Sequence, residues 1–93
     1  MTRSEARKNV LELLFEREFR ADETNEEIFH TSCESREIEK DDYIKRAYFG
    51  VCENVAAIDE EINKNSKGWK ANRLSKVSRS ILRLCIYEML YEK

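Results

Sequence analysis

The sequence has no proline and only two glycines, Gly50 and Gly68, among its 93 residues. Good helix formers such as glutamate, lysine, arginine and leucine fill its long segments. Hairpin turns need glycine at fixed positions, and two glycines are too few to connect a sheet of several strands. We therefore expect an all-α fold of about five helices in one domain that spans residues 1–93.

The first two helices are expected in the N-terminal third of the chain. The first should begin near Thr2, because Thr2 and Glu5 have the spacing of a capping box, and should end near Phe19 or Arg20. A short acidic helix of low hydrophobicity is expected over residues 26–34. The break between them should fall in the polar stretch before residue 26.

The third helix is expected to be long and unbroken. Asp41 or Asp42 should cap it, and residues 65–68 should end it. Gly50 lies inside it and weakens it by about 1 kcal/mol relative to alanine, unless a neighbouring helix packs closely there. The helix is predicted by the most regular apolar pattern of the sequence, with steps of three and four: Ile44, Tyr48, Val51, Val55, Ile58 and Ile62.

The last helix is unusually apolar. A short helical turn over 69–74 and a helix over about 78–92 are expected, and between Ile81 and Tyr91 only Arg83 and Glu88 are charged. A helix that is apolar around most of its circumference is normally buried. Four preceding segments are too few to surround it, so we expect further C-terminal helices or a second chain to cover it. A homodimer or helix exchange would place at the interface Ile81, Cys85 and Met89.

The charges are distributed asymmetrically. The chain has a net charge of -2, yet the stretch between Ile62 and Tyr87 has no acidic residue and contains Lys64, Lys67, Lys70, Arg73, Lys76, Arg79 and Arg83. One concentrated basic surface on an acidic protein is typical of a protein that binds a polyanion such as nucleic acid. Pairing of this stretch with the protein's own carboxylates, or with an acidic protein partner, stays open as an alternative.

Several residues are candidates for RNA contact. Arg3 and Arg7 are four residues apart and share one helix face, with Lys8 beside them. Trp69, next to a glycine in the basic stretch, offers a ring for an unpaired base. In the last helix three cations advance by three and four residues, so that one face can follow a phosphate backbone: Lys76, Arg79 and Arg83.

The sequence gives no sign of an enzyme. The single His30 has no evident nucleophile partner, and no glycine-rich phosphate loop is present. His30 and Cys33 lack the two further ligands of a zinc site, and three widely separated cysteines form no disulfide framework. No metal and no cofactor are expected. No apolar run is long enough for a membrane span or placed for a signal peptide, so we expect a cytoplasmic protein without a membrane partner.

Three segments together resemble the NusB family of bacterial transcription antitermination factors. They are "TRSEARKNVLELLFE" at the start, "YFGVCENVAAIDEEINKNSKGW" in the middle and "WKANRLSKVSRSILRLCIYEMLYEK" at the end. The most specific part is the pattern Arg-Leu-x-x-Val-x-Arg-x-Ile-Leu-Arg-Leu-x-x-Tyr-Glu, which covers Arg73 to Glu88. The resemblance extends over nearly the whole chain, and residues 22–40 contribute least.

The resemblance implies an all-helical fold of two small bundles packed across each other. It also implies a partner, the ribosomal protein NusE, and a ligand, the boxA element of ribosomal RNA transcripts. The family's arginine-rich first turn corresponds here to Arg3, Arg7 and Lys8, but Ser4 and Glu5 stand where relatives can have further arginines. Family members continue with two more helices after the segment that ends at Lys93, so a C-terminally shortened domain with an incomplete second bundle is expected.

Two other functions stay open at this point. Domains similar to NusB also occur as accessory domains of RNA cytosine methyltransferases. A helical module that recognises protein alone, without RNA, would also fit the pattern.

Overall fold

The computed structural model describes residues 2–36, 41–65 and 70–92, and all its regular structure in these ranges is helical. It therefore confirms the all-α prediction. The elements are α1 (Arg3–Arg17), α2 (Asn25–Arg36), α3 (Asp42–Glu53), α4 (Val55–Asn65), the short 3₁₀ helix η1 (Ala71–Arg73) and α5 (Lys76–Tyr91).

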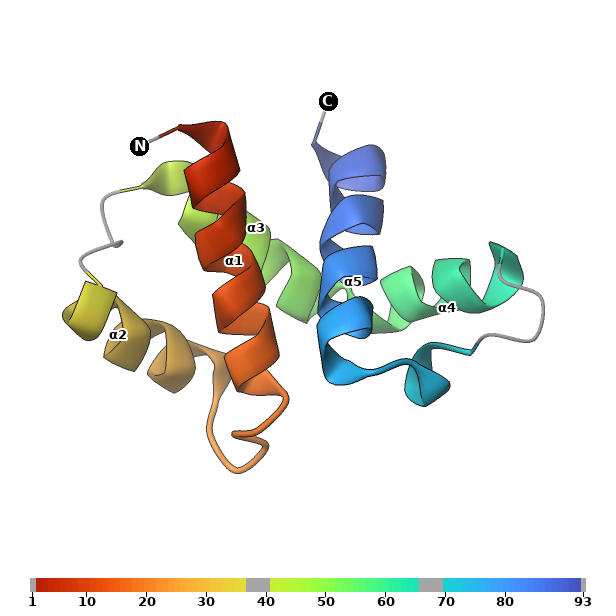
Figure 1. Cartoon of the computed structure of the whole chain (residues 1–93), viewed down its shortest axis with the longest axis horizontal. Coiled ribbons are helices and arrows are strands. Elements are labelled where there is room, and N and C mark those ends of the chain that lie inside the picture. Colours follow the sequence, from red (N-terminus) through yellow and green to blue (C-terminus); the bar gives the residue numbers. More distant parts are fainter. Residues whose placement is uncertain (1, 37–40, 66–69, 93) are drawn as a thin grey trace.

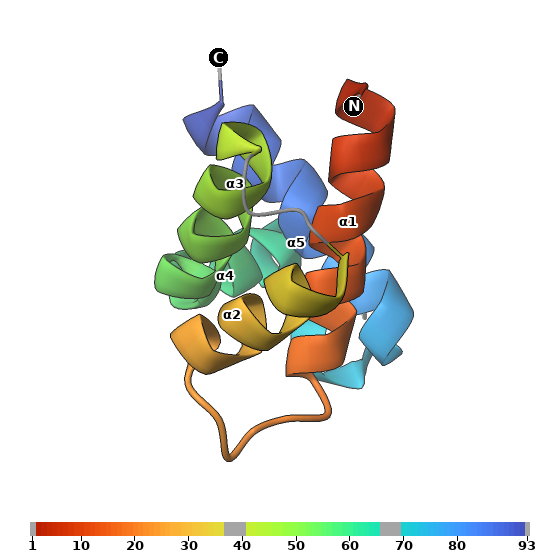
Figure 2. The same ribbon diagram turned by 90° about the vertical axis from the view of Figure 1, so that its left-hand side faces the viewer.

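Helix α3 lies behind α1 and α5 in Figure 1 and joins the two halves of the molecule. Helix α1 packs against α2, α3 and α5, whereas α4 packs mainly against α5. Figure 2 shows α2 lying crosswise to α1 on the side of the molecule that faces the viewer. The inward face of α3 is fully buried and forms the centre of the core with Ile44, Ala47, Tyr48 and Val51.

Both N-terminal helices begin with a capping threonine. The Thr2 hydroxyl accepts a hydrogen bond from the backbone N–H of Glu5 at 3.1 Å, as the sequence predicted. Helix α1 ends at Arg17, earlier than expected, because the backbone N–H groups of the next three residues bond three residues back and form tighter turns. Thr24 and Glu27 form a capping box that the sequence analysis missed, so α2 begins at Asn25.

The long third helix that the sequence predicted is instead two helices, α3 and α4, separated at Asn54. The side-chain amide of Asn54 donates to the carbonyl oxygen of Gly50 at 2.8 Å, and its φ of -115° and ψ of 19° leave the helical region. The amide thus caps α3, and the backbone N–H of Ile58 bonds to the Asn54 carbonyl to start α4. The apolar spacing continued across the break and concealed it.

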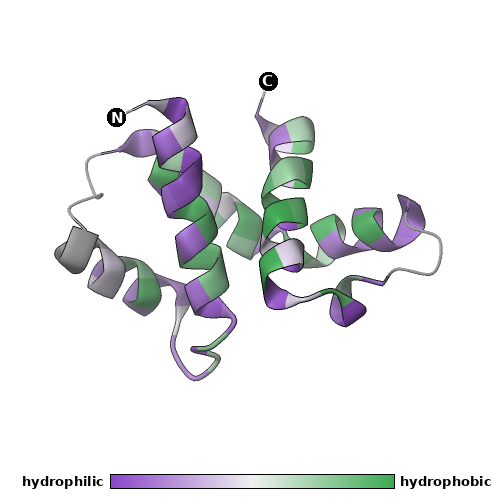
Figure 3. Cartoon of the chain, in the orientation of Figure 1, coloured by the Kyte–Doolittle hydropathy of each residue, from purple (hydrophilic) through white to green (hydrophobic). Residues whose placement is uncertain are grey.

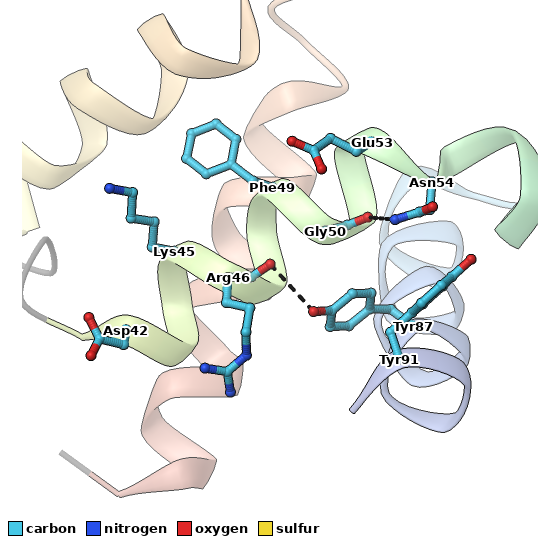
Figure 4. A pocket seen from close by; sticks show the side chains of 9 residues that line it. All are labelled: Asp42, Lys45, Arg46, Phe49, Gly50, Glu53, Asn54, Tyr87 and Tyr91. Carbon is cyan, nitrogen blue, oxygen red and sulfur yellow. Dashed lines mark hydrogen bonds between the residues drawn. The ribbon is translucent and has the colours of Figure 1, made fainter. Parts of the chain in front are cut away.

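Gly50 allows α3 and α5 to approach closely. A Cβ atom built on Gly50 would lie 2.4 Å from Cε1 of Tyr87, so no larger residue fits without moving that ring. The Tyr87 hydroxyl donates to the carbonyl oxygen of Arg46 at 3.5 Å (Figure 4). Helix α5 therefore packs closely on Gly50, and this close approach accounts for a glycine inside α3.

Helix α5 begins at Lys76, two residues before the expected start, because the Ser75 hydroxyl accepts from the backbone N–H of Ser78 at 3.1 Å and caps it. Only one face of α5 is buried, and it carries Ser80, Leu84 and Tyr87. Figure 3 shows α5 green over most of the side that faces the viewer. Several apolar side chains of this helix are exposed, including Ile81 and Met89.

Within the described residues, no helix is both long and apolar enough to cross a membrane.

Candidate nucleic-acid and protein interface

The cations predicted near the N-terminus lie on the exposed start of α1. The Arg3 guanidinium stacks over the ring of Tyr43 at 4.0 Å from its centroid. The Arg7 side chain is 47% exposed, and its Nε donates to both carboxylate oxygens of Glu88 at 3.0 and 3.1 Å. Lys8 is exposed. All three cations are therefore open to a ligand from solvent.

Tyr43 connects these cations to α5. Its hydroxyl donates to Glu88 at 2.9 Å, and burial, reinforced by this hydrogen bond, raises the pKa of Tyr43 to about 12. The guanidinium of Arg46, on the next turn of α3, lies 5.8 Å from the same ring and forms a two-pronged ion pair with Glu92 at 2.6 and 2.9 Å. The beginnings of α1 and α3 and the end of α5 thus meet in one network of charged groups.

Arg79 and Arg83 are engaged inside the molecule. Nε of Arg79 donates to Glu18 at 2.7 Å, and Arg83 donates to both oxygens of Asp59 at 2.9 and 2.8 Å and to Glu18 at 3.2 Å. Their side chains are only 15% and 11% exposed. The hydrogen bonds to Asp59 raise the pKa of Arg83, which therefore stays charged. This is the intramolecular pairing that the sequence analysis left open, and RNA contact by these two arginines stays a prediction.

The other predicted contacts differ in their surroundings. Lys76 is exposed, with Nζ 4.7 Å from the ring centroid of Phe19. Because Lys76, Arg79 and Arg83 all face the end of α1, the expectation of one shared face is correct. Trp69 lies outside the described residues. Lys64, 68% exposed and 3.6 Å from Glu61, is loosely held, as expected for a residue near the turn.

An apolar groove of about 260 Å³ separates the outer edges of α1 and α5. Phe15 of α1 and Ile81 of α5 are partly exposed on its walls, and Lys8 and Glu12 stand at its polar edge. This groove was not predictable from the sequence, because the spacing of residues within α1 or α5 does not show that the two helices pack together. Lys8 therefore belongs both to the N-terminal cations and to the groove.

A second, larger groove of about 760 Å³ lies between α3 and α5 (Figure 4). Gly50 and Asn54 line it together with three aromatic rings, those of Phe49, Tyr87 and Tyr91. Tyr87 and Tyr91 are stacked, with centroids 5.5 Å apart. Its charged rim contains both signs, from Asp42, Lys45, Arg46 and Glu53.

The described residues offer no group of three or more histidine, cysteine, aspartate or glutamate side chains that could hold a metal ion. Cys52 is half-buried, and burial raises the pKa of its thiol, whereas Cys85 is exposed on α5.

Comparisons with known proteins agree with this architecture. The model of the NusB family matches residues 4–93. The transcription antitermination protein NusB of Clostridium acetobutylicum is 39% identical, and the match covers all of this chain and 70% of that protein. NusB of Clostridium botulinum strain Hall is 38% identical, with all of this chain and 76% of that protein covered.

A solved structure gives the same result for the fold. A chain in a crystal structure described as a plectonemic RNA supercoil superposes with a TM-score of 0.82 and 31% identity, over 95% of this chain and 65% of that one. A family match over almost the whole sequence, together with relatives of this identity, shows that the chain belongs to the NusB family.

Proposed function

We propose that this protein is a cytoplasmic RNA-binding transcription antitermination factor, which binds boxA-type RNA of ribosomal RNA transcripts together with the ribosomal protein NusE. Two relatives, 39% and 38% identical to this chain over the aligned residues, are named transcription antitermination proteins. The observation that carries the RNA-binding part is the exposed cation group at the start of α1, formed by Arg3, Arg7 and Lys8.

The ion pair of Arg7 is open on the arginine side, where the side chain is 47% exposed, whereas Glu88 is 21% exposed. Glu88 keeps the hydrogen bond from the Tyr43 hydroxyl if Arg7 turns to an RNA phosphate, so this exchange leaves the carboxylate with a partner. Arg3 and Lys8 lie on the same first turns, so a strand that passes the start of α1 meets three cations in succession. Each phosphate contact to a single strand contributes about 0.7 to the dependence of log affinity on log salt.

Arg79 and Arg83 need a larger rearrangement to contact RNA. Their guanidinium groups would have to leave Glu18 and Asp59, and charges in a largely buried network are costly to uncouple. Lys76 needs no such change, because its ammonium group contacts only the face of Phe19 among the described interactions. We therefore place Lys76 with the N-terminal cations as a first contact and expect Arg79 and Arg83 to contribute less.

The groove between α1 and α5 is the proposed docking site for NusE. It has apolar walls, including Phe15 and Val77, and a polar edge, as is typical of the centre and rim of a protein interface. Lys8 stands at this edge and also belongs to the RNA-binding cations. Protein and RNA would thus bind at adjoining positions, which explains physically why NusE should strengthen RNA binding.

The test is a titration of labelled single-stranded boxA-like RNA with the protein, with and without NusE, over a range of salt concentrations. The Arg7→Ala variant should bind more weakly and with a shallower salt dependence. Lys64→Ala should match the wild type, since Lys64 lies in the last turn of α4, and the end of α4 is on the opposite side of the molecule from the start of α1 (Figure 1). Phe15→Glu should remove the gain from NusE and leave binding of RNA alone intact. Equal affinity for duplex DNA, with no gain from NusE, would reject the proposal.

A further inference from the structure

Tyr43 lies between the buried core and the cations at the start of α1. It stands in the first turn of α3, where the Asp41 side chain accepts a hydrogen bond from the backbone N–H of Ile44 at 3.1 Å and caps the helix. Tyr43 belongs to the hydrophobic core and is only 4% exposed. Packing and the helix cap therefore fix its ring in place before any ligand binds.

The ring of Tyr43 restrains Arg3. The centre of the Arg3 guanidinium lies 4.0 Å from the ring centroid, which is the distance of a cation–π contact. Arg3 is an exposed residue, and an exposed arginine has many rotamers to lose when it binds a ligand. A guanidinium that stacks through its flat face keeps its N–H groups at its edge, where a phosphate can accept hydrogen bonds from them. The ring thus restrains Arg3 without occupying the groups that would bind RNA.

The hydroxyl of Tyr43 restrains Arg7 through Glu88. It donates to Oε2 of Glu88 at 2.9 Å, and Nε of Arg7 donates to both oxygens of the same carboxylate at 3.0 and 3.1 Å. The side chains of Glu88 and Arg7 are 21% and 47% exposed, so the contacts lead from the core to the surface. Without the hydroxyl, Arg7 would be the one donor left to this carboxylate among the described hydrogen bonds, and Glu88 would compete more strongly with RNA for it.

We propose that Tyr43 is a positioning residue for RNA binding, which holds Arg3 by its ring and Arg7, through Glu88, by its hydroxyl. The inference rests on the proposed function, because it concerns the same cations. Arginines that are already ordered lose less side-chain freedom when a phosphate binds, so the RNA is bound more tightly. Tyr43 acts through the two arginines, since it is itself almost wholly buried.

Fluorescence anisotropy titrations of one labelled single-stranded boxA-like RNA test the proposal, with each affinity referred to the folded fraction measured by circular dichroism. Tyr43→Phe keeps the ring and removes the hydroxyl, and it should weaken binding about threefold. In an Arg7→Ala background the same change should have no effect, because the hydroxyl acts through Arg7. A merely structural role of the hydroxyl would weaken binding equally in both backgrounds.

Tyr43→Leu removes the ring as well and should weaken binding about tenfold. The part of this loss that exceeds the loss in Tyr43→Phe should disappear in an Arg3→Ala background, because the ring acts through Arg3. The two arginines thus separate the two contributions of one side chain.

Tyr87→Phe is the matched control. Tyr87 is also 4% exposed, and its hydroxyl donates at 3.1 Å to Glu92, which follows Glu88 by one turn of α5. That carboxylate pairs with Arg46 of α3 and not with the cations of α1. Tyr87→Phe should therefore leave the RNA affinity of the folded protein unchanged.

The outcomes separate this inference from the proposed function. Wild-type affinity in Tyr43→Phe, an equal loss with and without Arg7, or the same loss in Tyr87→Phe would overturn the positioning role of Tyr43. The proposed function would still stand if Arg7→Ala alone bound RNA more weakly. Arg3→Ala and Arg7→Ala variants that bind RNA as tightly as the wild type would reject both.

Discussion

The guanidinium of Arg83 on α5 donates to both carboxylate oxygens of Asp59 on α4, at 2.9 and 2.8 Å, and to Glu18 beyond the end of α1 at 3.2 Å. Three parts of the chain that are distant in the sequence are thus held by one side chain that is 11% exposed. Removal of one partner from such a network leaves a carboxylate without its counter-charge in a largely buried position.

Arg83→Ala should therefore lower the free energy of unfolding by about 2 kcal/mol. Urea denaturation followed by circular dichroism measures this loss, and Lys64→Ala, which removes an exposed cation, should change it by less than about 0.5 kcal/mol. Equal stability of the two variants would contradict the structural role given to Arg83.

Arg79→Ala tests the two roles considered for the basic face of α5. Arg79 donates to Glu18 at 2.7 Å and to the Ala71 carbonyl at 3.2 Å, so we expect a loss of stability. The RNA affinity of the folded fraction should fall less than in Arg7→Ala, because the Arg79 side chain is mostly buried. A stable Arg79→Ala variant with weaker RNA binding and a shallower salt dependence would instead make Arg79 a principal RNA contact.

Gly50→Ala should destabilise the protein although alanine favours helices. The helical preference alone would stabilise by about 1 kcal/mol. The added Cβ would lie 2.4 Å from the buried Tyr87 ring, and the resulting overlap should give a net loss of about 1 to 2 kcal/mol. In a Tyr87→Leu background the same substitution should be neutral or stabilising, and a double-mutant cycle of unfolding free energies measures the difference.

The protein should lose stability as the pH rises above 10. Tyr43 has a folded-state pKa of about 12 against an ordinary value of 10.0, so the unfolded chain releases this proton at lower pH than the folded protein does. The contribution of Tyr43 is therefore fully present below pH 10 and decreases between pH 10 and 12. Tyr43→Phe should flatten this part of the curve of unfolding free energy against pH, and an unchanged slope would count against the burial of this hydroxyl.

The sequence predicted the helices well where the signals are local. The capping box at Thr2 and the apolar spacing of Ala6, Val10, Leu13 and Leu14 define α1, and all four apolar residues are buried. The break at Asn54 was missed, because both helices keep their apolar residues in one register across it. A side-chain amide that caps the preceding helix is visible only when the backbone geometry is known.

The candidate site was less predictable. The cation clusters were found from the sequence, but the carboxylates that bind them, such as Glu18 and Asp59, are 61 and 24 residues away from their arginines. Helical spacing orders residues within one helix and carries no information about which helices meet. The exposed face of α5 was predictable, since its apolar residues exceed what one buried face can hold.

The most direct test of the central claim is a fluorescence anisotropy titration of one single-stranded boxA-like RNA with the wild type and with a variant that combines Arg3→Ala, Arg7→Ala and Lys8→Ala. The three cations are exposed, so the variant should fold as the wild type does. We expect a large loss of RNA affinity and a salt dependence of log affinity that is shallower by about 2, since three phosphate contacts contribute about 0.7 each. A variant that binds the RNA as tightly as the wild type, with the same salt dependence, would contradict the account.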